Sequence, residues 1–155
     1  MYQRILAAVD DSTTSNLALK EAIGLAKDQH AILRIVYVVD EVSLYGDAQF
    51  VDPSEIEKAW IETGHKILAK AQSLARSAGI DAEVKLLETE NIGERMADAI
   101  VAEAKGWPAD LVVAGTHGRS GLNHLLMGSV AEGIVRSSPV PILLVRDWQQ
   151  KVGSA

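Results

Sequence analysis

The sequence contains no cysteine, which excludes disulfide bonds, thiolate metal sites and cysteine nucleophiles. Aromatic residues are also scarce, with one Phe, three Trp and three Tyr, so an aliphatic core is expected. No apolar run approaches the roughly 18 residues that a membrane span needs. The first residues, MYQRILAAVDD, lack the apolar segment and cleavage site of a secretory signal. We therefore expect a cytoplasmic protein that is neither secreted nor membrane-spanning.

A surplus of positive charge is also missing, because 15 Lys and Arg are outnumbered by 21 Asp and Glu. The formal net charge is −6, and the basic residues form no stripe that could follow a phosphate backbone. We therefore expect no nucleic-acid partner. The apolar fraction of 48% is typical of a globular protein, and 155 residues suit a single domain. We expect this domain to span residues 1–148 and to leave 149–155 as a frayed tail.

Apolar segments and helical patterns alternate along the chain. Short apolar runs predict strands at residues 4–10, 31–40, 82–88, 111–115 and 141–145. Between them, apolar residues recur at helical spacing in four stretches. We expect these helices to end near Asp28, to run from Pro53 to Gly79, to run from a cap at Asn91 to Ala104, and to run from Ser129 to Arg136.

This alternation predicts an α/β fold with an open, five-stranded parallel sheet and helices on both faces, flavodoxin-like or Rossmann-like in its winding. Ligands of such sheets bind beyond the carboxyl ends of the strands, where the strand order reverses. Asp10, Asp40 and Gly115 each stand where an apolar strand ends. We therefore expect the functional site near these residues.

The segment GTHGRSGLNHLLMGS, residues 115–129, is rich in glycine and follows an apolar strand. Glycine permits positive φ and lets backbone N–H groups approach a ligand, and a helix N-terminus favours an anion. Arg119 could add a fixed cation, and Ser129 a hydroxyl, to the same anion. The alternative interpretation is a tight strand-to-helix turn with Ser129 as the N-cap. The segment is neither a Walker A loop nor a dinucleotide fingerprint, because the chain has no Gly-Lys pair and no G-x-G.

The spacing of Gly115, Gly118, Gly128 and Ser129 resembles the G-x2-G-x9-G-[ST] motif of the universal stress protein family. The resemblance extends over nearly the whole chain, from ILAAVDDS through YVVDE to GSVAEGIVRSSPVPILLVR. It implies the strand order 3-2-1-4-5, the binding of ATP, with Mg²⁺ or Mn²⁺ as an accompanying ion, and the formation of dimers. By the same resemblance, Ala8 and Asp10 would face the ribose and adenine, and Val38 would contact the base.

The resemblance also implies which residues hold the rest of the nucleotide. Those expected to wrap the ribose and phosphates are Ala114, Gly115, Thr116, His117, Gly118 and Arg119. Those expected to hold the phosphate tail at the start of the following helix are Gly128, Ser129 and Val130.

Other candidate sites receive less support from the sequence. Asp10 and Asp11 could hold a metal ion bound to the phosphates, but adjacent side chains on an extended chain point in opposite directions, so at most one joins the site. Asp11 or Ser12 is expected to cap the first helix instead. His117 and His124 fit polar loop residues, and the spacing of the four histidines indicates no metal cluster. No Ser-His-acid triad can be assigned.

The last strand, from Pro141 to Val145, would expose unpaired backbone groups if it lies at a sheet edge. We expect it to pair antiparallel with its counterpart in a homodimer, and coverage by the C-terminal tail is the alternative. The leading hypothesis is an ATP-binding stress-response switch with a protein partner that the sequence does not identify. A slow ATPase or phosphotransferase using the same glycine segment, and an interaction protein without nucleotide, remain alternatives.

Overall fold

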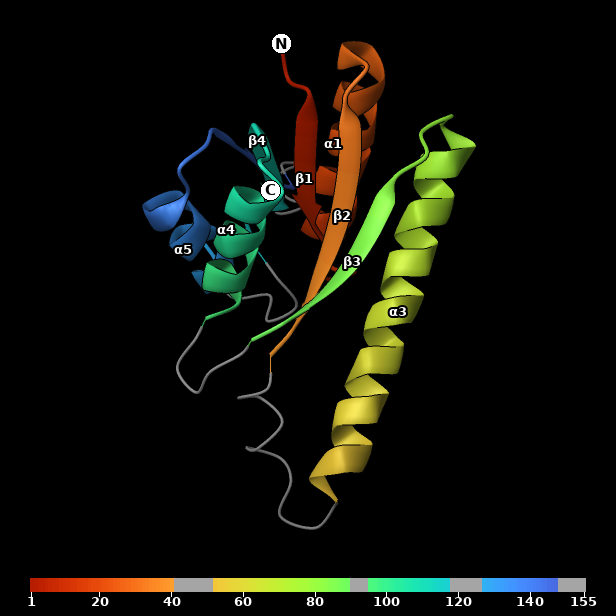
Figure 1. Cartoon of the computed structure of the whole chain (residues 1–155), viewed down its shortest axis with the longest axis vertical. Coiled ribbons are helices and arrows are strands. Elements are labelled where there is room, and N and C mark those ends of the chain that lie inside the picture. Colours follow the sequence, from red (N-terminus) through yellow and green to blue (C-terminus); the bar gives the residue numbers. More distant parts are fainter. Residues whose placement is uncertain (41–51, 90–94, 118–126, 148–155) are drawn as a thin grey trace, which may run out of the picture.

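The computed structural model of the chain describes residues 1–40, 52–89, 95–117 and 127–147. Within these residues, five parallel strands form one sheet in the order β3-β2-β1-β4-β5 (Figure 1). The strands are β1 (Arg4–Ala8), β2 (Ile32–Val39), β3 (Glu83–Glu88), β4 (Leu111–Gly115) and β5 (Ile142–Val145). The predicted α/β fold and strand order are confirmed, and most strands are one or two residues shorter than expected.

Helices follow the strands, and their bounds are α1 (Thr13–Gln29), α3 (Pro53–Ser77), α4 (Met96–Gly106) and α5 (Ser129–Ser137). The start of α4 corrects the sequence prediction. Its N-cap is Arg95 and not Asn91, because the Arg95 N–H donates to the carboxylate of Asp98, 3.0 Å away, and the Arg95 backbone is extended. Asn91 itself lies outside the described residues. No helix in the described part of the chain is both long and apolar enough to cross a bilayer.

The helices cover the two faces of the sheet in pairs (Figure 1). Side chains alternate along each strand, so Ile5 and Ala7 pack with α1 and α3, whereas Leu6 and Ala8 face α4 and α5. Both sets are apolar because a parallel sheet is buried on both faces. Because the strands are parallel, the carboxyl ends of β1, β2 and β4 lie along the same side of the sheet. Strand β5 is the outermost strand, next to β4.

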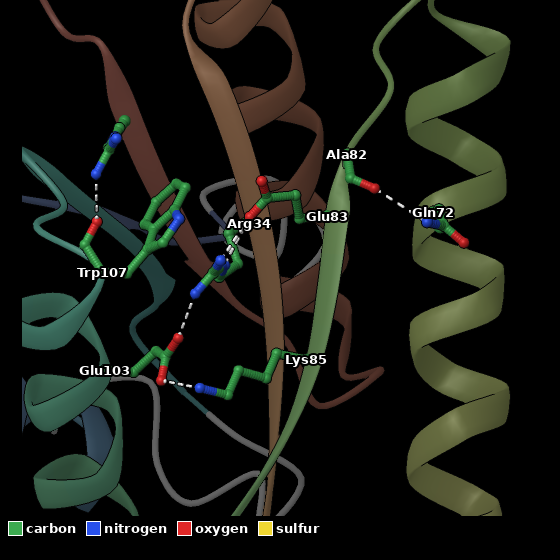
Figure 2. A network of polar contacts seen from close by, with 8 residues as sticks. Arg34, Gln72, Ala82, Glu83, Lys85, Glu103 and Trp107 are labelled. Carbon is green, nitrogen blue, oxygen red and sulfur yellow. Dashed lines mark hydrogen bonds and ion pairs between the residues drawn. The ribbon is translucent and has the colours of Figure 1, made fainter.

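A polar network fastens α4 to β2 and β3 (Figure 2). Arg34 on β2 forms ion pairs with Glu83, at 2.7 Å, and with Glu103 of α4, at 2.6 Å, and Lys85 of β3 reaches Glu103 at 2.8 Å. The Arg34 guanidinium lies 4.5 Å from the centre of the Trp107 ring, at the end of α4. Both cations share the carboxylate of Glu103, so its charge links the helix to two strands.

Candidate functional site

A cavity of about 360 Å³ opens at the carboxyl ends of β1, β2 and β4. This volume falls in the range of pockets that hold small molecules, roughly 300–1,000 Å³. Every predicted nucleotide-binding residue that the structure describes lines it, and Gly118 and Arg119 lie outside the described residues. The lining residues from this set are Ala8, Asp10, Val38, Ala114, Gly115, Thr116, His117, Gly128, Ser129 and Val130.

Gly115, at the end of β4, is required by packing. A Cβ at this position would lie 2.8 Å from the Thr14 hydroxyl oxygen and about 3 Å from the backbone of Thr14 and Ser15. Neither Gly115 nor Gly128 has a positive φ. The expected reason for glycine, a backbone conformation that other residues rarely adopt, therefore does not apply to these two positions. The first glycine of the motif instead lets the N-terminus of α1 approach the end of β4.

Backbone hydrogen bonds hold the described residues on either side of the glycine-rich segment. The Gly128 N–H donates to the Thr116 carbonyl oxygen at 2.7 Å, and the Thr116 N–H donates to the Val145 carbonyl oxygen at 2.9 Å. On the α1 side, the Thr14 hydroxyl donates to the His117 carbonyl oxygen. The bond between Gly128 and Thr116 joins the two described ends of the glycine-rich segment, and the other two bonds connect its first residues to β5 and α1.

Helix α5 begins beside this closure, with Gly128 as its N-cap and Ser129 as its first residue. The alternative interpretation of Ser129 as the N-cap is therefore wrong, and no described side chain caps the helix. The N–H groups in the first turn of a helix have no intrahelical acceptor. At α5 these groups belong to residues that line the cavity, so they can donate hydrogen bonds to an anion held there.

His117 contributes a second polar group to the same end of the cavity. Its Nδ1 lies 2.9 Å from the Thr116 hydroxyl oxygen, so that contact fixes the ring. Its Nε2 is buried and has no hydrogen-bond partner within the described residues.

Only one of the two aspartates after β1 lines the cavity, as expected. Asp10 lines the cavity, and its carboxylate accepts from the Ser12 N–H at 2.9 Å. Asp11 forms an ion pair with Lys70 at 3.2 Å and does not line the cavity. Ser12 is the N-cap of α1, and its hydroxyl oxygen accepts from the Ser15 N–H. Of the two predicted caps, Asp11 and Ser12, the structure therefore has Ser12.

Several lining residues were not assigned to the site from the sequence. The strand-end position of Asp40 predicts that it lies near the site, and Asp40 does line the cavity, although it was not among the residues expected to bind the nucleotide. Met96 and Ile100 were expected only in a helix, because nothing in their spacing separates a cavity wall from a core. The helical spacing places Trp60 among the apolar residues of α3 and does not indicate that it lines a cavity. These additional lining residues are Val9, Ser15, Val36, Tyr37, Asp40, Trp60, Met96, Ile100 and Ala131. In the described residues there is no group of three or more His, Asp or Glu that could hold a metal ion, and His124 lies outside them.

The model of the universal stress protein family matches residues 1–146. The chain belongs to the universal stress protein family. A universal stress protein of Methanocaldococcus jannaschii is 34% identical over 149 residues, which cover 94% of this chain and 83% of that protein. The resemblance inferred from the glycine spacing is thereby confirmed.

Solved universal stress protein structures share this fold. A family member from Burkholderia pseudomallei has a TM-score of 0.73 and 33% identity, and the match covers 93% of this chain and 96% of that one. A universal stress protein in complex with cAMP has a TM-score of 0.69 and 26% identity, covering 93% and 97% of the two chains. One from Archaeoglobus fulgidus in complex with dAMP has a TM-score of 0.65 and 25% identity, covering 93% and 98%. Relatives of this universal stress protein therefore bind adenine nucleotides.

Proposed function

We propose that this universal stress protein binds an adenine nucleotide, ATP, in the cavity at the strand ends, as a nucleotide-dependent switch in the stress response. The observation that carries the proposal is the uncapped N-terminus of α5, which opens into a cavity lined in part by Gly115, Gly128 and Ser129 of the glycine motif. The relatives in complex with cAMP and dAMP support an adenine nucleotide as the ligand class. Mg²⁺ or Mn²⁺ could accompany the phosphates.

The charges around the cavity support one orientation of the nucleotide. The carboxylates of Asp10 and Asp40 follow β1 and β2, whereas the N-terminus of α5 and the Nε2 atom of His117 lie beyond β4. Phosphates are repelled by carboxylates and attracted by a helix N-terminus. The phosphates therefore point toward α5, and the ribose and base lie toward Ala8 and Val38.

Dimer formation through β5 belongs to the same proposal. This strand is at the end of the sheet, and its side chains are only partly buried within one chain. An edge strand with unpaired N–H and C=O groups can pair with a second copy across a two-fold axis. A switch of this kind requires that ATP binds two states of the dimer with different affinity. The cytoplasm remains the expected compartment.

Substitution of Gly128 by Asp tests the anion-binding end of the cavity. Aspartate is a favourable N-cap, so α5 is expected to remain folded while its carboxylate repels the phosphates. Calorimetry should then give an ATP affinity at least about tenfold weaker than that of the parent protein. Gly24→Asp is the matched control, because it adds the same charge at an exposed position in α1 and should leave the affinity unchanged.

The nucleotide can also be identified directly. The parent protein is denatured as purified, and released small molecules are analysed by mass spectrometry before ATP is titrated into the stripped protein. Release of an adenine nucleotide, or titratable ATP binding, supports the proposal. Equal ATP affinity in the parent and Gly128→Asp would contradict the anion site at α5, and no binding to the parent would contradict the proposed function.

A further inference from the structure

Trp60 contributes the only tryptophan side chain that lines the cavity among the described residues. It lies in α3, which packs against β2 and β3, whereas α5 lies at the β5 end of the sheet. The indole is partly buried against the core beneath α3. Trp60 therefore meets the cavity from the side opposite to the helix N-terminus where the phosphates are proposed to bind.

Gly64 fixes the position of this tryptophan. It lies one turn after Trp60 on the same side of α3, because residues four apart share a helix face. A Cβ on Gly64 would lie 2.5 Å from Cδ1 of Leu86 and 2.8 Å from Cδ1 of Tyr37. The helix can therefore lie directly on the sheet only because position 64 has no side chain. This close approach sets the distance between α3 and Tyr37, and both Trp60 and Tyr37 line the cavity.

We propose that Trp60 contacts the base of the bound nucleotide and makes this cavity selective for ligands with an aromatic ring over phosphates alone. The inference rests on the proposed function, since it assigns the base end of the same site. Asp10 and Asp40 disfavour an anionic group near the β1 and β2 ends, so the uncharged part of the ligand occupies that end. An indole beside a flat purine gains stacking energy that a phosphate or a ribose cannot supply.

Affinity measurements with two ligands test the role of Trp60. Trp60→Leu should weaken ATP binding by about fivefold to a hundredfold, whereas the affinity for inorganic tripolyphosphate, which has no base, should stay as in the parent. Trp60→Phe keeps an aromatic ring and should recover most of the ATP affinity. Trp107→Leu is the matched control, because Trp107 lies beside Arg34 and does not line the cavity. Thermal unfolding of each variant checks that it is folded.

Fluorescence gives a second readout that a purely structural role of Trp60 would not produce. The emission of the parent should change when ATP is added, and that of Trp60→Phe should not, so the difference between them isolates Trp60. The inference is overturned if Trp60→Leu binds ATP as tightly as the parent, or if it loses affinity equally for ATP and tripolyphosphate. A parent protein that binds no ATP overturns the proposed function and, with it, this inference.

Discussion

At the residue scale, the glycines of the motif serve different purposes. Gly115 is needed because α1 comes within van der Waals distance of β4, and Gly128, with an extended backbone, is the N-cap of α5. The sequence could predict that both matter, because their spacing is that of the family. It could not predict why Gly115 is glycine, since the close approach to Thr14 and Ser15 exists only after the strand and helix have packed.

Gly115→Ala is expected to destabilise the protein by about 1–3 kcal/mol, because a Cβ would overlap backbone atoms that cannot move away cheaply. Urea unfolding followed by circular dichroism measures this change. Gly24→Ala is the control, because a Cβ there meets nothing within 4 Å and alanine favours the helix. A Gly115→Ala protein as stable as the parent would contradict this explanation.

Glu103 is the central residue of the network between α4, β2 and β3, with its side chain only 10% exposed. Burial alone would raise the pKa of this carboxyl. Hydrogen bonds and positive charges from Lys85 and Arg34 outweigh burial and hold the pKa below its usual value of 4.5. The ionised carboxylate is therefore favoured by folding.

Glu103→Gln should lower the free energy of unfolding at pH 7 by about 1–3 kcal/mol, because two cations lose their shared carboxylate. Glu132→Gln is the matched control, since its pair with Arg136 is exposed and should contribute less than about 1 kcal/mol. The folded pKa is lowered, so the advantage of the parent is complete above the unfolded pKa and is lost as pH falls through the folded value. A difference that persists unchanged at acid pH would contradict this assignment.

At the scale of elements, periodicity predicted the helices and strands well where apolar faces are long. The bounds of β4 and the ends of α3 follow from local signals, such as Pro53 near the start and Gly79 after the end. The start of α4 does not follow from such a signal. Its N-cap, Arg95, lacks a typical capping side chain, and the capping contact comes from Asp98 inside the helix. The position of Trp60 in the cavity wall could not be predicted for a similar reason, because it depends on the distance between α3 and β2.

Strand β5 gives a prediction about assembly. The carbonyl oxygens of Pro141 and Val145 accept hydrogen bonds from residues at either end of β4, so the backbone of Leu144 points to the open edge. Leu144→Pro removes an outward N–H without breaking the pairing with β4. We expect the parent to be a dimer and this variant a monomer when mass is measured by light scattering.

Leu144→Ala separates loss of the backbone donor from loss of side-chain contact. It shortens the side chain but keeps the N–H, and it should remain a dimer. If the proline variant is also a dimer, pairing of β5 with its counterpart is wrong, and a monomeric parent would contradict the homodimer itself.

At the scale of the whole molecule, strand order decides where the site lies. The order β3-β2-β1-β4-β5 puts β1 and β4 side by side, so the residues after each of them meet at one edge of the sheet. The alternation of strands and helices predicted that the site lies at these strand ends, and the resemblance to the universal stress protein family predicted which residues surround it. The family match ends at residue 146, and the expected domain limit at 148 and the frayed tail remain predictions outside the described residues.

A crystal structure of the protein grown with ATP tests the central claim most directly. The account predicts phosphate oxygens at hydrogen-bond distance from the first N–H groups of α5 and the base toward the ends of β1 and β2. A nucleotide bound elsewhere, or one whose phosphates point toward Asp10 and Asp40, would contradict it.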